Sequence, residues 1–160
     1  MMPRHQAPHR YEAQPRNMWA FLVRAAAAVG LAVYPVLLGA VVLWPSPIDR
    51  PAAGFLKATL TDLYSRGLPL WVDYALLEWS ANVVLFLPLG LLMGLLLPRR
   101  WVWLAVLCGV AVSIGVETVQ EAFLPQRYAT VNDVLANSLG SAVGAVLAYL
   151  LHPRRRRIRP

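Results

Sequence analysis

Residues 80–97 read SANVVLFLPLGLLMGLLL, a run without a single charged side chain. A helix rises about 1.5 Å per residue, so about 20 such residues cross the roughly 30 Å hydrocarbon core of a bilayer. The run therefore predicts a transmembrane helix, which begins nearer Leu70 if the aromatic residues before it are included. Three further apolar runs predict spans over residues 25–44, 101–116 and 134–151.

The composition of the whole chain agrees with these spans. The mean hydropathy is +0.52, and only 14% of the residues are charged, where soluble proteins have about a quarter. Such a chain cannot cover a water-facing surface with polar groups, so most of its surface faces lipid. The sequence predicts an all-α fold, a four-helix transmembrane bundle over residues 18–151. A disordered basic segment, 1–17, precedes the bundle and a basic cytoplasmic tail, 152–160, follows it.

Basic residues are concentrated in every second loop, as expected for a membrane protein with a fixed orientation. If the N-terminus lies in the cytoplasm, the cytoplasmic segments hold 11 of the 15 basic residues but, of the 8 acidic residues, only Glu12. Cytoplasmic loops are enriched in lysine and arginine, so this asymmetry predicts a plasma-membrane protein with both termini inside. The net charge of +7 follows this topology, and we therefore expect no nucleic-acid partner.

The first predicted outer loop, residues 45–79, has an internal apolar pattern. Phe55, Leu60 and neighbouring apolar residues recur within residues 51–66, and Gly67 follows as a C-terminal stop. This pattern predicts a short helix lying along the outer membrane interface. An ordered loop that caps the bundle is the alternative. In the first case, three aromatic side chains would lie at headgroup depth: Trp71, Tyr74 and Trp79.

Polar residues gather near the predicted outer ends of the last three spans. Polar groups within a bilayer are costly and usually face the interior of a bundle. The set comprises Glu78 and Asn82 before the second span, Glu117, Gln120 and Glu121 after the third, Arg127 in the following loop, and Asp133 and Asn137 at the fourth. Its four carboxylates face one arginine, and this acidic balance favours recruitment of a cation. We therefore predict a polar pocket that binds a ligand.

Each member of this set also has an interpretation that needs no ligand. Thr130 and Asp133 fit a capping box at the start of a helix. Asn82 and Asn137 are suited to interhelical hydrogen bonds. The helix-end residues Gln120 and Glu121 would simply be wetted. Four glycines at GxxxG spacing predict close helix packing: Gly90, Gly94, Gly140 and Gly144.

The residue types that are scarce limit the available chemistry. Cys108 is the one cysteine, and the three histidines lie at the ends of the chain, outside the apolar runs. The sequence has no G-x-S-x-G or H-E-x-x-H motif. We therefore predict no metal site, no cofactor and no histidine-dependent catalysis, whereas catalysis by carboxylates with a hard cation stays open.

The ordered polar set resembles the VanZ-like family over residues 77–151. The resemblance rests on the segment NVVLFLPLG at 82–90, on E-x-x-Q at 117–120, on Arg127, and on D-x-x-x-N-x-x-G-x-x-x-G at 133–144. It implies a small membrane protein whose shared polar residues are Glu117, Gln120, Arg127, Asp133 and Asn137. The family takes its name from a member associated with low-level resistance to teicoplanin-type glycopeptides. The resemblance implies no particular biochemical activity.

Two classes of function fit these observations. In the first, the protein is a non-enzymatic accessory or binding protein of the cell envelope. Its outer pocket would then engage a lipid headgroup, a lipid-linked wall precursor or another membrane protein. In the second, it is a membrane-embedded hydrolase or transferase that acts on a lipid-linked envelope precursor. One carboxylate would then be the general base, and Arg127 would hold a phosphate through its two-pronged guanidinium.

Overall fold

The computed structural model of the protein describes residues 16–44, 53–124 and 130–152, and every regular element within them is a helix. The elements are α1 (Arg16–Val42), α2 (Ala53–Ser65), α3 (Tyr74–Leu96), the 3-10 turn η2 (Arg99–Trp101), α4 (Trp103–Phe123) and α5 (Val131–Leu151). Among the described residues, α1, α3, α4 with η2, and α5 are long and apolar enough to cross a membrane. The predicted all-α class and its four spans are confirmed. The tail from 153 onward lies outside the described residues.

The first helix begins more than two turns earlier than the predicted start at Ala25. Met18, Trp19 and Phe21 continue the apolar surface toward the N-terminus, so residues 16 and 17 are helical rather than part of a disordered segment. The prediction stopped at Arg24, whose charge is unfavourable in lipid. In the structure an Nη atom of Arg24 donates a hydrogen bond at 2.9 Å to the carbonyl oxygen of Leu96, the last residue of a neighbouring span.

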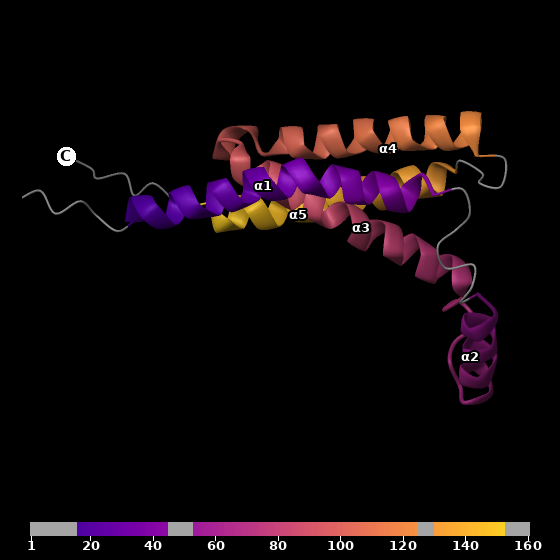
Figure 1. Cartoon of the computed structure of the whole chain (residues 1–160). Coiled ribbons are helices and arrows are strands. Elements are labelled where there is room, and N and C mark those ends of the chain that lie inside the picture. The colour runs from indigo at the N-terminus through magenta and orange to yellow at the C-terminus, as the bar shows by residue number, and fades with distance from the viewer. Residues whose placement is uncertain (1–15, 45–52, 125–129, 153–160) are drawn as a thin grey trace, which may run out of the picture.

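The four spans alternate in direction, so α1 and α4 run one way and α3 and α5 run the other (Figure 1). The most extensive contact joins the parallel helices α3 and α5, while α1 packs on α3 and α4 packs on α5. We call the end where α3 and α5 begin the polar end. We call the opposite end, where η2 connects α3 to α4, the arginine end. Large apolar side chains cover the outward faces of the bundle, as a lipid-facing surface requires.

Glycines allow α3 and α5 to approach to backbone contact. A Cβ atom added at Gly90 would lie 2.1 Å from the carbonyl oxygen of Ser141. One added at Gly140 or Gly144 would lie 2.1 Å from a carbonyl oxygen of α3. Side-chain atoms do not tolerate such distances, so this seam accepts only glycine at these three positions. Small residues at helix interfaces have the same function in other membrane bundles.

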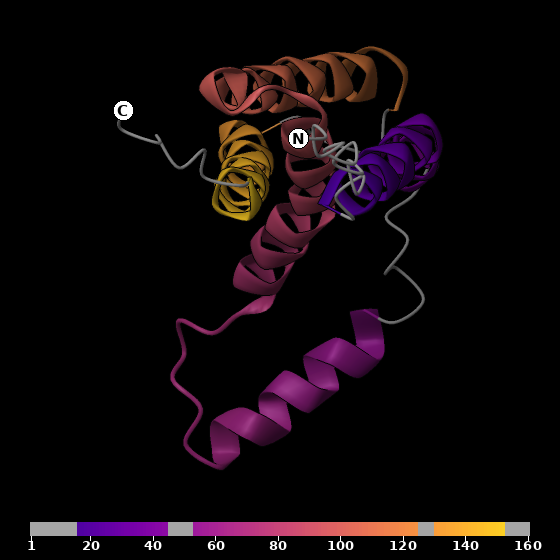
Figure 2. The ribbon, with the colours of Figure 1, turned by 90° about the vertical axis from the view of Figure 1, so that its left-hand side faces the viewer.

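The short helix α2 stands apart from the bundle, to one side of it and close to the start of α3 (Figures 1 and 2). Gly67 ends it in the left-handed conformation, with φ of +100°. The amide of Gly67 bonds to Tyr64 O at 3.1 Å, and the amide of Leu68 bonds to Leu63 O at 3.0 Å, which together form a Schellman motif. The predicted stop at Gly67 is confirmed.

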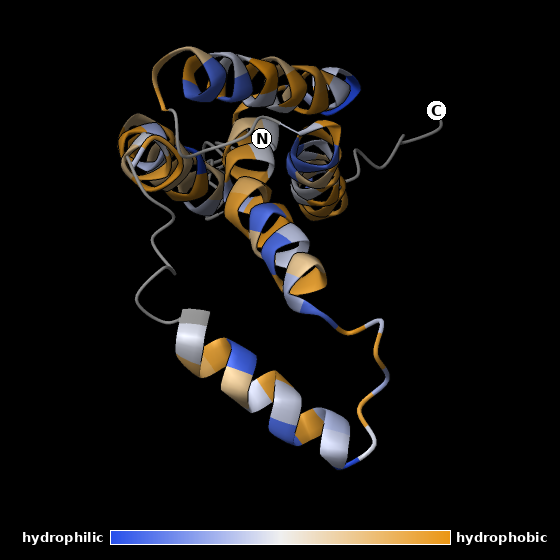
Figure 3. Ribbon diagram, turned by 90° about the vertical axis from the view of Figure 1, so that its right-hand side faces the viewer, coloured by the Kyte–Doolittle hydropathy of each residue, from blue (hydrophilic) through white to orange (hydrophobic). Residues whose placement is uncertain are grey.

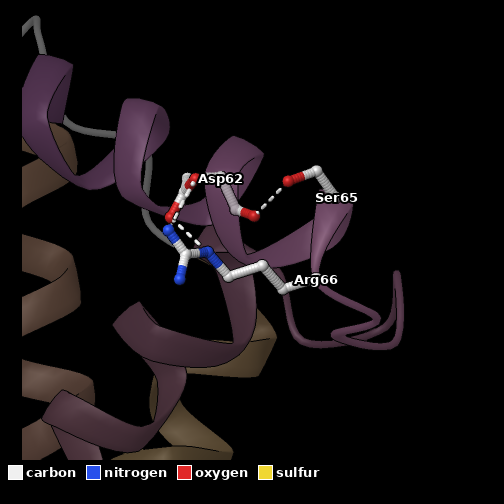
Figure 4. A network of polar contacts seen from close by, with 3 residues as sticks. All are labelled: Asp62, Ser65 and Arg66. Carbon is white, nitrogen blue, oxygen red and sulfur yellow. Dashed lines mark hydrogen bonds and ion pairs between the residues drawn. The ribbon is translucent and has the colours of Figure 1, made fainter.

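The surface of α2 mixes hydrophilic and hydrophobic residues, whereas the spans are mostly hydrophobic (Figure 3). Near its end, Arg66 Nε lies 2.9 Å from a carboxylate oxygen of Asp62, and the hydroxyl of Ser65 donates to the Asp62 carbonyl (Figure 4). Both charged side chains are exposed, so this ion pair contributes at most about 1 kcal/mol. The helix predicted over residues 51–66 is therefore present, with bounds at Ala53 and Ser65.

Candidate functional site

One face of α4 turns three polar side chains into the protein at successive helical turns. Ser113 is fully buried, and Glu117 and Gln120 are 8% and 6% exposed. The spacing of three and four residues explains why they share a face. These exposures are low without any lipid around the bundle, so neighbouring helices rather than the membrane enclose these groups. Glu121 follows Gln120 on the helix but is exposed.

Glu117 accepts a hydrogen bond from the N-cap residue of α5. The hydroxyl of Thr130 accepts a hydrogen bond from the amide of Asp133 at 3.1 Å, so Thr130 is the N-cap residue, as its sequence context predicts. A local capping box would return the Asp133 side chain to the Thr130 amide. In the structure that amide donates instead to an Oε atom of Glu117 at 3.2 Å, across from α4. The carboxylate of Glu117 therefore ties α4 to α5.

Asp133 links the start of α5 to α3. Its Oδ1 accepts a hydrogen bond from the amide of Asn82 at 2.8 Å, and its Oδ2 accepts one from the Thr130 hydroxyl at 2.6 Å. Both oxygens of this carboxylate are thus engaged within the protein. The first turn of a helix also favours a negative charge electrostatically. Asn82 and Asp133 therefore have partners that fasten helices together.

Gln120 satisfies a backbone group at the end of α1. Its amide nitrogen donates to the carbonyl oxygen of Val42 at 2.6 Å. Val42 is the last residue of α1, and the last four carbonyls of a helix have no partner within it. In a membrane an unpaired carbonyl costs several kcal/mol, so this bond gives Gln120 a structural role.

Asn137 differs from these residues because half of its amide group has no partner. Its nitrogen donates to the Ser113 hydroxyl at 3.0 Å, but its Oδ1 is buried and accepts no hydrogen bond from the described residues. One turn further along α5, the buried hydroxyl of Ser141 also lacks a partner there. Gly109 of α4 lies opposite, where an added Cβ would meet the Ser141 oxygen at 2.0 Å. The seam between α4 and α5 therefore holds two unused polar atoms.

The structure brings together five of the eight predicted site residues. Asn82, Glu117, Gln120, Asp133 and Asn137 lie where α3, α4 and α5 meet at or just below the polar end. Glu78 and Glu121 are exposed at the same end. Arg127 lies outside the described residues, and so does its predicted ion pair with a carboxylate. The described residues contain no group of three histidine, cysteine or acidic side chains placed to hold a metal ion.

Sequence reasoning missed Ser141 as a member of the buried polar seam. A serine beside Gly140 in an apolar helix is easily taken for a small packing residue. The available signal was its position four residues after Asn137, which places both side chains on one face of α5.

The order and spacing of these polar residues can be compared with those of known proteins. A family model described as VanZ/LLP1 matches residues 31–152. The chain belongs to the VanZ/LLP1 family. The match starts within α1 and ends just past α5, so it extends beyond the predicted resemblance at residues 77–151 and includes the second part of α1 and the whole of the other three spans. Comparison with curated proteins and with solved structures found no match.

Proposed function

We propose that this VanZ/LLP1 protein is a non-enzymatic binding protein of the cell envelope. Its polar end faces outward, and the seam between α4 and α5 binds the polar group of a lipid or of a lipid-linked wall precursor. The orientation is supported by the 11-to-4 distribution of basic residues in the sequence. It places the arginine end and both termini in the cytoplasm, and α2 along the outer interface.

The single observation that carries the binding proposal is the unpartnered Oδ1 of Asn137, whose side chain is 3% exposed. A buried amide oxygen without a donor costs about 1–3 kcal/mol. The neighbouring carboxylates of Glu117 and Asp133 each accept a hydrogen bond within the protein, and the Gln120 amide donates one, so the Asn137 oxygen differs from the other groups of this network. No donor among the described residues reaches the oxygen of Asn137, so it is available to accept a hydrogen bond from a bound ligand.

The chemistry of the seam limits the ligand class. Asn137 Oδ1 accepts only, and the carboxylate of Glu117 one turn away accepts as well. A ligand that fits this seam presents hydroxyl, amide or ammonium hydrogens, as the sugar of a lipid-linked wall precursor or an amine headgroup does. Association with glycopeptide susceptibility would follow if the ligand is a wall precursor.

Native mass spectrometry of the full chain, extracted from its own membrane in mild detergent, tests this proposal. The wild type is expected to retain a lipid adduct that is lost in Asn137→Leu and weakened at least tenfold in Glu117→Gln. Glu121→Gln is the matched control, because it removes the same charge from an exposed position four residues away. Equal adduct retention in all four proteins would overturn the proposal. Release of a cleaved product that depends on Glu117 would replace it with the hydrolase alternative.

Single-cysteine labelling in a Cys108→Ala background tests the orientation. An impermeant reagent added to intact cells is expected to modify cysteines at positions 62 and 126 and to spare those at 99 and 156. Modification at position 99 from outside would contradict the assignment of the arginine end to the cytoplasm.

A further inference from the structure

The arginine end carries basic side chains that no described carboxylate neutralises. Arg24, Arg99 and Arg100 lie there, and the structure pairs none of them with an acidic side chain of the described residues. The acidic residues of the described segments occur in α2, in the turn before α3, or toward the polar end of the spans. Positive charge therefore accumulates at this end without a counter-ion among the described residues.

Arg24 and His152 contact backbone carbonyl oxygens at the helix ends. Arg24 donates to Leu96 O, and the ring of His152 lies 3.0 Å from Leu97 O and 2.7 Å from Ala148 O. The parallel helices α3 and α5 both end here, so their unpaired carbonyls concentrate partial negative charge. Arg24 and His152 contact three of these carbonyls, whereas no hydrogen bond from Arg99 or Arg100 to a carbonyl is seen among the described residues.

Aromatic rings rather than carboxylates position those two arginines. The guanidinium carbon of Arg99 lies 4.0 Å from the ring centroid of Tyr149 on α5, and its buried Nε has no acceptor among the described residues. The guanidinium carbon of Arg100 lies 5.8 Å from the ring centroid of Trp101. Stacking on a ring orients a guanidinium while its in-plane N–H groups stay available to an anion.

The adjoining tryptophans place this group at the depth of lipid headgroups. The rings of Trp101 and Trp103 lie 6.0 Å apart, and the two residues are 41% and 52% exposed. Tryptophan is enriched at the interface between a membrane and water because its ring is apolar and its N–H is polar. The two arginines therefore lie at the level where phosphates of lipids are found.

We propose that Arg99 and Arg100 form a binding site for the phosphate of an anionic membrane lipid of the phosphatidylglycerol type. Their oriented N–H groups match the oxygens of a phosphate. The acyl chains of the lipid would lie along the exposed apolar faces of α4 and α5. Basic clusters of this kind at helix ends attract anionic headgroups. This site is separate from the proposed polar pocket and does not depend on it.

Lipid binding to the delipidated full chain in detergent, measured by native mass spectrometry, tests the site. Phosphatidylglycerol is expected to bind at least tenfold more tightly than phosphatidylcholine. The double variant Arg99→Gln with Arg100→Gln is expected to lose this preference. Arg99→Lys with Arg100→Lys keeps the charge and the topology signal but not the planar fork, so it is expected to retain a reduced preference. The control is Lys57→Gln with Arg66→Gln, which removes the same charge from α2 and its end.

Three results would overturn the proposal. In the first, the two lipids bind equally to the wild type. In the second, the control and the Arg99/Arg100 glutamine variant lose phosphatidylglycerol to the same extent, which would mean that only net charge matters. In the third, inorganic phosphate displaces the lipid at equal concentration, which would make the site one for free phosphate. Circular dichroism of each variant verifies that helix content is unchanged.

Discussion

The two sides of α5 meet their neighbours in different ways. Toward α3, Gly140 and Gly144 bring backbone against backbone, with no space for even a Cβ atom. Toward α4, Asn137 and Ser141 present polar groups, and the side-chain oxygen of each has no partner among the described residues. The same helix thus has one side packed to the limit of steric contact and another with unused hydrogen-bonding capacity.

This difference separates the residues that hold the fold together from those available for binding. The glycine seam needs no side chain and no ligand to be complete. The polar seam is complete only in part, because Glu117, Gln120 and Asp133 have partners whereas the amide oxygen of Asn137 has none. Substitutions on the two sides of α5 should therefore separate stability from function.

The largest loss of stability is expected on the glycine side. In Gly144→Ala the new Cβ would meet Leu87 O at 2.1 Å, and backbone atoms of α3 must move to admit it. The free energy of unfolding in detergent, measured by denaturant titration with circular dichroism, should fall by about 2–3 kcal/mol. Gly115→Ala on α4 is the control, since nothing lies near its added Cβ. Equal effects of the two substitutions would show that the seam is looser than described.

A smaller loss is expected where α5 begins. Thr130→Ala removes the hydroxyl that accepts from the Asp133 amide and donates to the Asp133 side chain. Loss of an N-cap costs about 1 kcal/mol. Thr130→Ser keeps the hydroxyl and should retain most of the stability in the same titration. If serine is as destabilising as alanine, the cap does not contribute.

The smallest change is expected on the polar side. Asn137→Leu combined with Ser113→Ala removes a hydrogen-bonded pair together with the unpartnered oxygen. Replacement of both partners by apolar groups is nearly neutral, so the free energy of unfolding should change by less than about 0.5 kcal/mol. If the hydrogen bond between Asn137 and Ser113 instead serves to hold α4 and α5 together, the free energy of unfolding should fall by about 1–2 kcal/mol. The denaturant titration used for Gly144→Ala distinguishes these two changes in the free energy of unfolding.

The sequence predicts the spans and the residues of the site better than it predicts their partners. The four apolar runs, the stop at Gly67 and the cap at Thr130 follow from local patterns and agree with the structure. The early start of α1 was missed because Arg24 seemed to end the apolar run, although its charge reaches a carbonyl of another helix.

Partners within the site depend on how distant segments meet. Nothing near Gln120 in the sequence indicates that its amide bonds to Val42 O on α1, or that Glu117 accepts from the Thr130 amide at the start of α5. The unpartnered oxygen of Asn137 is likewise visible only once α4 and α5 are packed together. A pattern of polar residues predicts that a buried polar set exists, but it does not identify which residue has an unused hydrogen-bonding group.

The most direct test of the central claim compares function with abundance in a deletion strain. Asn137→Leu and Glu117→Gln are expected to lose complementation of envelope-stress or glycopeptide sensitivity, with immunoblot levels near those of the wild type and of the Glu121→Gln control. Glu117→Gln keeps an oxygen for the Thr130 amide, so its fold should survive. Full complementation by both variants, or activity that falls only in proportion to abundance, would contradict a binding role for the seam between α4 and α5.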